Sequence, residues 1–509
     1  MNISEIRKYK NHVLMAFIFG IPFLVEMYIE FFFHQPPAFQ YVIDAFNNWR
    51  FWSRIIELIA IYLILCLSYF LSSYKKSVIA VWAFFIYIPE ALNVVSTYVT
   101  GFSLYSGFVG TILTANLQEI IFTSFDYFFF ILINIVVIFT AFRISKKITF
   151  TDKKYGKYFL GIFIIAVCGS HFQPLQAIGG AFSDYFNDLK ELENYDDQPF
   201  KNIKSDFPTQ KQTYVLVIGE SVDKKHMQIY GYDRETTPCF KKIENELFVF
   251  KNVRTAHVLT NDAVKSMLQL IDKNGKKSTI IHFFKNAGFK TFWFSNQGQN
   301  HFFDNVLKRI GMLCDQSVFI NRTDFRNMVH QKYFDEELLK YFQNALRDPA
   351  NKKLIILHLS GSHFPLDLRY PKKFKKFSVS EGYRDKKKAK VVCEYDNSIL
   401  YTDYVLNETI SILKAEGGIS CLLYLSDHGQ DIYDRKDCEL TSRKTIHAYE
   451  IPFVVWVSED YRKANLDFIN LWNLNVNFMT DKTAYSIIDL ARLRCDCLDL
   501  SDSIFRGSF

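Results

Sequence analysis

The chain has 509 residues, of which 49% are apolar, and it carries a formal net charge of +7. A chain of this length exceeds what one hydrophobic core normally organises, so we expect at least two domains. No pattern of interleaved basic and aromatic residues typical of a nucleic-acid-binding module stands out, and we expect no nucleic-acid partner.

Five long apolar runs crowd the first third of the chain, and none recurs after about Gln173. Most of them approach the ~20 residues that a helix needs to cross a bilayer. They are Val13–Phe33, Trp52–Leu71, Val78–Val99, Ile120–Phe142 and Tyr158–Phe172. The first run lacks a small-residue cleavage site, so we expect an uncleaved anchor rather than a signal peptide. Residues 1–173 are therefore predicted to form a transmembrane domain with five helices.

Basic residues in the short loops predict the orientation of these helices. Lys and Arg cluster before the first run, after the second and around residues 143–157, whereas the opposite loops offer only Arg50. The side richer in Lys and Arg faces the cytoplasm, so we expect the amino terminus there. Five crossings then place everything after Phe172 in the periplasm of a Gram-negative cell, and the chain is predicted to be a multi-pass protein of the bacterial inner membrane.

Residues 174–213 are polar, with Pro199 and Pro208 as breakers, and we expect a partly helical linker at the membrane interface. From Tyr214 onward, apolar runs alternate with helical patterns such as Phe334–Leu346 and Ser398–Ala415. The predicted strands are Tyr214–Ile218, Thr291–Ser295, Leu354–Leu359, Cys421–Ser426 and Pro452–Val457. Continuous apolar strands between helices favour an α/β fold over residues 214–509, with a mostly parallel sheet covered by helices on both faces.

Seven of the nine cysteines lie outside the apolar runs of the first third. An odd number leaves at least one thiol unpaired within a monomer, and the spacing indicates neither particular disulfides nor a zinc ribbon. Because Cys421 falls inside a predicted strand, we expect it to be the free thiol.

Polar side chains follow several of the predicted strands. Ligands bind beyond the carboxyl ends of strands in such sheets, so these residues are expected to share one pocket. They are Glu220, Ser295 through Gln297, His358 with His363, and Asp427 with His428. Zinc favours imidazole and carboxylate ligands, and a catalytic zinc site keeps one position open. Glu220, Asp427 and His428 supply three such ligands.

The fourth ligand of such a site can be an oxygen nucleophile whose pKa the metal lowers. Thr255 and Thr260 present hydroxyls just before a helical pattern, and a helix amino terminus places backbone N–H groups where phosphate oxygens can bind. A purely structural interpretation also exists. Strand-terminal acids often cap helices, and Thr260-Asn261-Asp262 is an ordinary capping sequence.

The combination of these segments resembles the bacterial phosphoethanolamine transferases that modify lipid A and core sugars, members of the alkaline-phosphatase and sulfatase superfamily. The resemblance covers nearly the whole chain: five membrane helices, a linker and an external α/β domain. The matching segments are Val217–Ser221, Tyr230–Tyr232, Arg234–Pro238, Phe292–Gln297, Leu357–Pro365, Ser426–Gly429 and Tyr449–Phe453.

The resemblance implies a zinc enzyme in which the metal is held by Glu220, Thr260, Asp427 and His428. Thr260 would be the nucleophile, with Thr255 as the alternative, and would attack the phosphorus of phosphatidylethanolamine with release of diacylglycerol. The phosphoethanolamine on threonine would then pass to lipid A or lipooligosaccharide. The acceptor group stays open between a lipid A phosphate, a sugar hydroxyl and a protein, and we expect a monomer.

By the same resemblance, five further residues would bind substrate: His363, His447, Asn116, Glu119 and Asn296. Asn116 and Glu119 fall in the external loop before the fourth membrane helix, where relatives are thought to hold the ethanolamine headgroup. His358 is expected behind the site. The family's further histidine is missing around Cys438 and Glu439, which leaves His447 as the nearest candidate and a second zinc ion open.

Two other functions are compatible with the sequence. One is a phosphoglycerol transferase of the same superfamily. The other is a membrane receptor that keeps the fold without the activity, because Asp223 stands where many relatives carry a basic residue and Glu439 departs from the family pattern. A sulfatase is disfavoured, since no Cys or Ser is followed by x-Pro-x-Arg.

Overall fold

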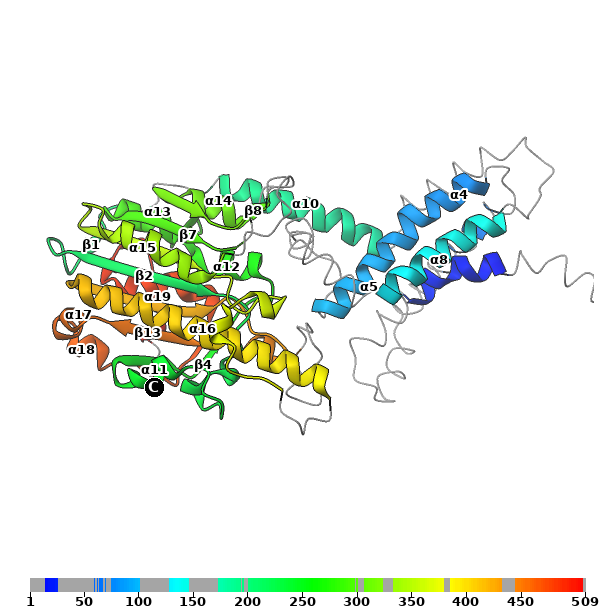
Figure 1. Cartoon of the computed structure of the whole chain (residues 1–509). Helices are drawn as coiled ribbons and strands as arrows, with labels where there is room; N and C mark the ends of the chain where they lie inside the picture. The colour runs from blue at the N-terminus through cyan, green and yellow to red at the C-terminus, as the bar shows by residue number, and fades with distance from the viewer. Residues whose placement is uncertain are drawn as a thin grey trace, which may run out of the picture. The chain divides into compact units, whose positions relative to one another are not determined.

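The computed structural model describes residues 14–25, 75–100, 128–145, 173–193, 200–297, 299–300, 306–323, 333–379, 385–432 and 445–506, together with isolated positions between 59 and 69 and Tyr195. The chain divides into two compact units (Figure 1). Of the described residues, those up to Asp184 form the first unit and those from Tyr185 onward form the second. The division falls inside helix α10 (Gln173–Glu193), which is the helical part of the predicted linker.

The described part of the first unit is helical. Its elements are α4 (Lys75–Trp82), the π-helical turn η2 (Ala83–Tyr87), α5 (Ile88–Thr100) and α8 (Phe128–Ser145). One stretch, Lys76–Ser96, is long and apolar enough to cross a membrane, whereas Leu14–Val25 and Leu132–Ile144 are shorter apolar helices. The count of five membrane helices stays a prediction, because the second and fifth apolar runs lie mostly or wholly outside the described residues.

The second unit contains a seven-stranded sheet with the strand order β3-β13-β12-β2-β11-β7-β9. The strands are β2 (Gln212–Gly219), β3 (Leu247–Phe250), β7 (Lys290–Ser295), β9 (Gln316–Phe319), β11 (Lys352–His358), β12 (Ile419–Ser426) and β13 (Phe453–Val457). The five strands from β12 to β9 are parallel, whereas β13 is antiparallel to both of its neighbours. Every residue of β2 and β12 is buried, as expected for strands that appear in the sequence as unbroken apolar runs. The sheet is therefore mixed. Of the predicted strands, the one at 452–457 is antiparallel to its neighbours, and the others are parallel to one another.

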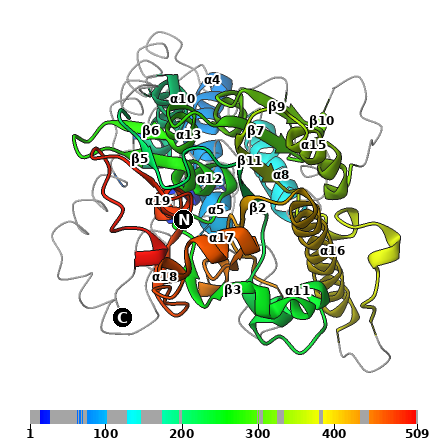
Figure 2. The ribbon, with the colours of Figure 1, turned by 90° about the vertical axis from the view of Figure 1, so that its left-hand side faces the viewer.

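Helices cover both faces of this sheet (Figure 2). On one face, Val215 and Val217 of β2 belong to the same buried cluster as residues of α15 (Leu338–Leu346) and α16 (Lys386–Glu416). On the other face, the ring of Tyr214 contacts Phe284 of α13 (Ile280–Asn286). Alternate residues of one strand thus pack against different helix layers, which is the arrangement predicted for an α/β sheet.

Helix α16 begins at Lys386, well before the predicted start at Ser398. The Asp385 side chain accepts hydrogen bonds from the backbone N–H groups of Lys387 and Lys388, at 3.1 and 3.2 Å, and so caps the helix. The first turns of α16 are rich in lysine and carry little apolar periodicity. For that reason the sequence did not indicate a helix there.

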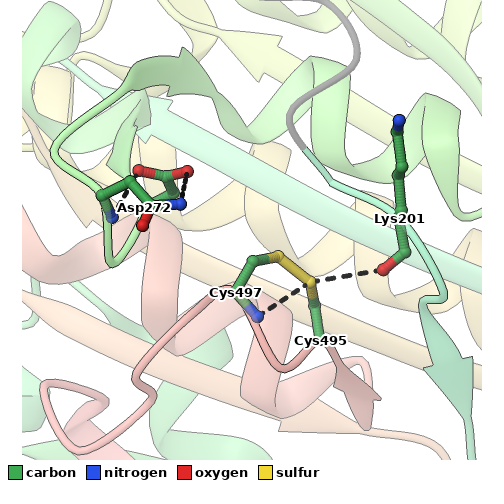
Figure 3. Close-up of a disulfide and its surroundings, with 5 residues drawn as sticks. Lys201, Asp272, Cys495 and Cys497 are labelled. Atoms are coloured by element: carbon green, nitrogen blue, oxygen red, sulfur yellow. Dashed lines mark hydrogen bonds between the residues drawn. A yellow bond between two sulfur atoms is a disulfide. The ribbon is translucent and has the colours of Figure 1, made fainter.

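A disulfide joins Cys495 and Cys497, a pair that the spacing had not indicated (Figure 3). The Sγ atom of Cys495 lies 3.5 Å from Lys201 O, and Lys273 N donates to Cys497 O at 2.9 Å. These contacts connect the end of the chain to the linker and to the turn beside Asp272. Cys421 is buried and unpaired, as predicted, but it is not the only free thiol of this unit, because Cys239, Cys314 and Cys393 are unpaired as well.

Candidate functional site

Glu220 and Asp427 meet because the strands that precede them are neighbours in register. In the parallel pair β2–β12, Ser426 stands opposite Gly219, and Asp427 N donates to Gly219 O at 3.1 Å. Ser221, with a φ of 58°, turns the chain directly after Glu220, and its N–H donates to Asp427 Oδ1 at 2.9 Å. Both carboxylates therefore lie at the carboxyl edge of the sheet, where α/β folds bind ligands.

Glu220, Asp427 and His428 form a group that can hold a metal ion. One ligand atom from each lies within 4.8 Å of the others, and all three side chains are fully buried. His428 Nε2 lies 3.4 Å from Glu220 Oε1 and 3.4 Å from Asp427 Oδ2. His428 Nδ1 lies 2.8 Å from Gly429 O, which only accepts hydrogen bonds. The neutral ring therefore carries its proton on Nδ1, and the lone pair of Nε2 faces the carboxylates.

The chemistry of these three groups fits zinc. Two carboxylates and an imidazole lone pair converge in a buried space, and Asp427 Oδ2 has no hydrogen-bond donor within the described part of the chain. Burial raises the pKa of Asp427, because its charged form is unfavourable away from water. Buried charges are normally paired or coordinate a metal, and a mixed nitrogen and oxygen ligand set is typical of catalytic zinc.

Thr260 is the first residue of α12 (Thr260–Leu268), and its hydroxyl lies beside the three groups. Thr260 Oγ1 donates to Glu220 Oε2 at 3.1 Å and lies 3.5 Å from His428 Nε2. The hydroxyl of Thr255 instead lies 2.6 Å from Asp427 O and 2.8 Å from His257 O. Because carbonyl oxygens only accept hydrogen bonds, the proton of the Thr255 hydroxyl is directed to the backbone, whereas that of Thr260 is directed to the candidate metal centre.

Helix α12 is fastened to the linker by ion pairs. Lys265 Nζ lies 2.6 Å from Asp188 Oδ1 and 2.9 Å from Glu191 Oε2, both on α10. Glu191 also pairs with Lys277 at 2.5 Å. The last turns of the linker helix are thus bonded to the helix whose first residue is Thr260.

Two further residues hold the Glu220 carboxylate: Ser221, which was missed, and Gln297, which was expected in the shared pocket but without this role. Ser221 Oγ donates to Glu220 Oε1 at 2.6 Å. Gln297 Nε2 donates both to Glu220 Oε2 and to Leu359 O, each at 2.9 Å. Gln297 follows β7 at the same edge of the sheet, and this position after a predicted strand is the reason that it was expected in the pocket.

The segment Gly231–Pro238, which matches the family pattern, is structural in this fold. Arg234 Nη1 and the Tyr232 hydroxyl donate to Asp396 Oδ2 of α16, at 2.7 and 3.1 Å. Thr236 Oγ1 donates to His226 O at 2.6 Å and accepts from Gln228 N at 3.0 Å. The segment therefore connects the residues that follow Glu220 to α16, at a position where the α16 side chain Asp396 is buried.

The other predicted substrate residues have mixed positions. The Asn296 amide donates to Asp335 Oδ1 at 2.8 Å and to Tyr333 O at 3.2 Å, so its N–H groups face the protein interior. His363 is half-buried, and His447 Nδ1 lies 3.6 Å from Asp223 Oδ2. The remaining residues in this prediction, Asn116 and Glu119, lie outside the described residues, as do Cys438 and Glu439, where the family's further histidine is missing. Substrate contact stays a prediction for all of these side chains.

His447 is held close to the candidate metal centre by its backbone. Gly429 N donates to Ala448 O at 2.8 Å, and a Cβ atom at Gly429 would lie 2.0 Å from His447 O. Only glycine permits this approach directly after His428. The short helix η9 (Ile446–Ala448) is thereby brought to the edge that carries Asp427 and His428.

Replacing Gly361 by alanine is expected to lower the free energy of unfolding by about 1–3 kcal/mol. The residue has a φ of 48°, and a Cβ atom would lie 2.8 Å from both N and O of Glu220. Gly275→Ala is the matched control, because Gly275 has a φ of 80° with no atom near its Cβ position. Urea unfolding of both variants separates backbone strain from contact with Glu220. If both variants lose the same free energy of unfolding, the close approach of Gly361 to Glu220 adds no cost of its own.

His358 is expected to make the fold sensitive to acid. Burial lowers its pKa from 6.5 to about 4, while the charge of Glu220 opposes this shift. The unfolded chain therefore takes up a proton near pH 6.5 and the folded chain only near pH 4. Between these values the free energy of unfolding falls as the pH falls, by up to about 3 kcal/mol in total. Urea unfolding should show that the free energy of unfolding falls less between pH 7 and pH 5 in His358→Phe than in the wild type. An equal fall in both proteins would contradict the assignment of this acid sensitivity to His358.

Comparisons with known proteins agree with this fold and site. The family model described as Sulfatase matches residues 212–499, more than half of the chain. Phosphoethanolamine transferase EptC of Escherichia coli is 30% identical over 357 residues, which cover 66% of this chain and 61% of that protein. The match thus spans about three fifths of the length of this relative.

Two solved structures are similar as well. The periplasmic domain of E. coli EptC in complex with zinc superposes with a TM-score of 0.56 at 31% identity, covering 61% of this chain and 90% of that one. The second structure is the integral membrane protein lipooligosaccharide phosphoethanolamine transferase A of Neisseria meningitidis. The superposition covers 97% of this chain and 96% of that chain, with a TM-score of 0.59. At 17% sequence identity, this likeness shows a shared fold. The match over residues 212–499, which includes both strand ends of the candidate metal centre, shows that the chain belongs to the sulfatase family.

Proposed function

We propose that this chain is a zinc-dependent phosphoethanolamine transferase of the bacterial inner membrane, with its amino terminus in the cytoplasm and its catalytic domain in the periplasm. The observation that carries the proposal is the Thr260 hydroxyl, which lies between Glu220 and His428 at the start of a helix. The names of the relatives support it. In this proposal residues 1–173 form the membrane domain, 174–213 the linker and 214–509 the catalytic domain.

The proposed reaction has two displacements at one phosphorus atom. Thr260 Oγ1 attacks the phosphorus of phosphatidylethanolamine, the bond from phosphorus to the diacylglycerol oxygen breaks, and diacylglycerol leaves with a proton. Phosphoethanolamine remains on Thr260 as a phosphodiester. A hydroxyl or phosphate oxygen of lipid A or lipooligosaccharide then attacks the same phosphorus, and the Thr260 hydroxyl is restored.

Each residue has a defined part in this proposal. A zinc ion held by Glu220, Asp427 and His428, with Thr260 as the fourth ligand, would lower the pKa of the Thr260 hydroxyl and polarise the phosphoryl group. The hydrogen bond from Thr260 to Glu220 Oε2 directs the hydroxyl proton away from the substrate and leaves lone pairs of Oγ1 for phosphorus. First-turn N–H groups of α12 lack partners within the helix and can bind phosphoryl oxygens.

The proposal includes the substrate contacts expected from the family. His363 and His447 would contact the phosphoryl group, and Asn296 would lie deeper in the same pocket. Asn116 and Glu119 would hold the ethanolamine headgroup, where the Glu119 carboxylate can pair with its ammonium group. The enzyme is proposed to act as a monomer.

Transfer from labelled donor lipid tests the function. The full chain in detergent is given phosphatidylethanolamine that carries deuterium in its ethanolamine, together with lipooligosaccharide and zinc. Mass spectrometry should find the labelled phosphoethanolamine on the glycolipid and an equal amount of diacylglycerol. Transfer of phosphoglycerol from phosphatidylglycerol, with no transfer from phosphatidylethanolamine, would instead identify a phosphoglycerol transferase. Comparing envelope glycolipids of cells with and without the gene then identifies the acceptor.

A further inference from the structure

The loop Ser360–Phe364, which follows β11, lies directly against the backbone of Glu220. Leu359 N donates to Ile218 O and Ser362 N donates to Glu220 O, both at 2.9 Å, so the loop extends the pairing of β11 with β2. The positive φ of Gly361 brings its α-carbon so close that a Cβ atom would lie 2.8 Å from Glu220 N. The position of the Glu220 backbone therefore depends on the position of this loop.

Asp335 holds the first part of the loop through hydrogen bonds to its backbone. It is 1% exposed and begins the short helix η6 (Asp335–Glu337). Its Oδ1 accepts hydrogen bonds from Ser360 N and Asn296 Nδ2, both at 2.8 Å, and its Oδ2 accepts from Gly361 N at 3.0 Å. A buried carboxylate with three N–H donors fixes these groups more firmly than a neutral acceptor would.

Arg369 holds the second part of the loop. Its Nε donates to His363 O at 2.6 Å, its Nη1 to Ser360 Oγ at 2.7 Å and its Nη2 to Phe364 O at 2.7 Å. The rigid guanidinium group thus contacts three of the five loop residues at once, an arrangement that the single ammonium group of lysine cannot reproduce.

We propose that Asp335 is a positioning residue for the metal centre, because through the Ser360–Phe364 loop it sets the Glu220 backbone relative to Asp427 and Thr260. Arg369 completes the same device by fixing His363. The inference rests on the proposed function, in which Glu220 is a zinc ligand. Asp335 touches neither the three ligands nor Thr260 in any contact described for it, so its influence passes through Gly361 and Ser362.

The test compares Asp335→Asn with a matched control, Asp403→Asn, in the full chain. Asp403 is also 1% exposed and also accepts two backbone N–H bonds, from Cys239 and Phe240 at 2.7 and 3.0 Å, at the start of α11 (Pro238–Lys242). In each variant an amide nitrogen replaces one acceptor oxygen and leaves a donor unmatched. Zinc affinity, measured by competition with a chromophoric chelator, should fall about 10–100-fold in Asp335→Asn and stay at the wild-type value in Asp403→Asn.

Hydrogen exchange supplies a second readout that needs neither zinc nor activity. In metal-free protein, Asp335→Asn should raise amide exchange in both the 359–364 and the 218–222 peptides, whereas Asp403→Asn should raise it only near Cys239. Wild-type exchange at 218–222 in Asp335→Asn would overturn the inference. A wild-type chain that binds no zinc would instead overturn the proposed function. If Asp335→Asn does not fold, Arg369→Lys loosens the same loop in its place, and exchange should then rise in both the 360–364 and the 218–222 peptides. Wild-type exchange at 218–222 in that variant would equally overturn the inference.

Discussion

Thr260→Ala is expected to lower transfer by at least about 10³-fold, because loss of the nucleophile in enzymes with a covalent intermediate costs up to about 10⁶-fold. The Thr260 hydroxyl is 3.1 Å from Glu220 Oε2 and 3.5 Å from His428 Nε2, and it starts the helix whose first-turn N–H groups can bind phosphate. Alanine keeps the helix and the three candidate ligands. The measurement is the rate of phosphoethanolamine transfer at saturating zinc and donor lipid.

Two further variants connect this loss to covalent chemistry. Thr260→Ser keeps a hydroxyl and should retain measurable transfer, although the serine side chain has more rotational freedom. Thr255→Val removes the hydroxyl that now bonds to Asp427 O, so the protein should lose stability but still accumulate phosphoethanolamine on the chain when no acceptor is present. Intact mass spectrometry detects this adduct. If Thr260→Ala still accumulates the adduct, or if Thr255→Val is the one variant that does not, the nucleophile is Thr255.

The residues that the sequence located well are those that follow buried strands. Glu220 and Asp427 each come directly after a run of apolar residues, and parallel neighbours β2 and β12 deliver both to one edge of the sheet. The local pattern contained both the strand and the residue after it. The pairing of two strands separated by some two hundred residues was inferred from the chemistry that the two ends share.

The residues that the sequence did not reveal depend on tertiary contacts. Asp335 follows none of the strands predicted from the sequence, and its proposed role arises because Ser360 and Gly361, farther along the chain, donate to its carboxylate. Asn296 and Gln297 are adjacent, yet the Asn296 amide donates to Asp335 while Gln297 faces Glu220. The direction of a side chain after a strand is set by the turn that follows, and no periodicity predicts it.

Zinc removal should distinguish a metal centre from a structural ion cluster. At a free zinc concentration about 1,000 times the dissociation constant, binding adds about 4 kcal/mol to the stability of the native state, which corresponds to roughly 7 °C in the unfolding midpoint of a domain of about 300 residues. A chelator should therefore lower the midpoint of the full chain and abolish transfer. Readdition of zinc should restore both.

Glu220→Gln sharpens this test, because the substitution should weaken zinc binding but should not lower the stability of the metal-free protein. With zinc, the variant loses an anionic ligand, and its affinity should fall by more than the roughly 10–100-fold that changes outside the ligand set cost. Without zinc, two buried carboxylates whose ligand atoms lie within 4.8 Å of each other repel each other when both are ionised. The variant removes that repulsion, although its amide must also face donors that now bond to Glu220.

Metal-free Glu220→Gln should therefore unfold at the same midpoint as the metal-free wild type or at a higher one, while the zinc-dependent increase is largely lost. Glu450→Gln is the matched control, since Glu450 interacts electrostatically with His447, pairs with Lys225 at 2.6 Å and lies outside the candidate metal centre. Its zinc-dependent increase should equal that of the wild type. A full zinc response in Glu220→Gln would remove Glu220 from the ligand set. A lower midpoint in the metal-free variant would instead mean that the Glu220 carboxylate stabilises the fold through Ser221, Thr260 and Gln297, whose hydrogen bonds it accepts.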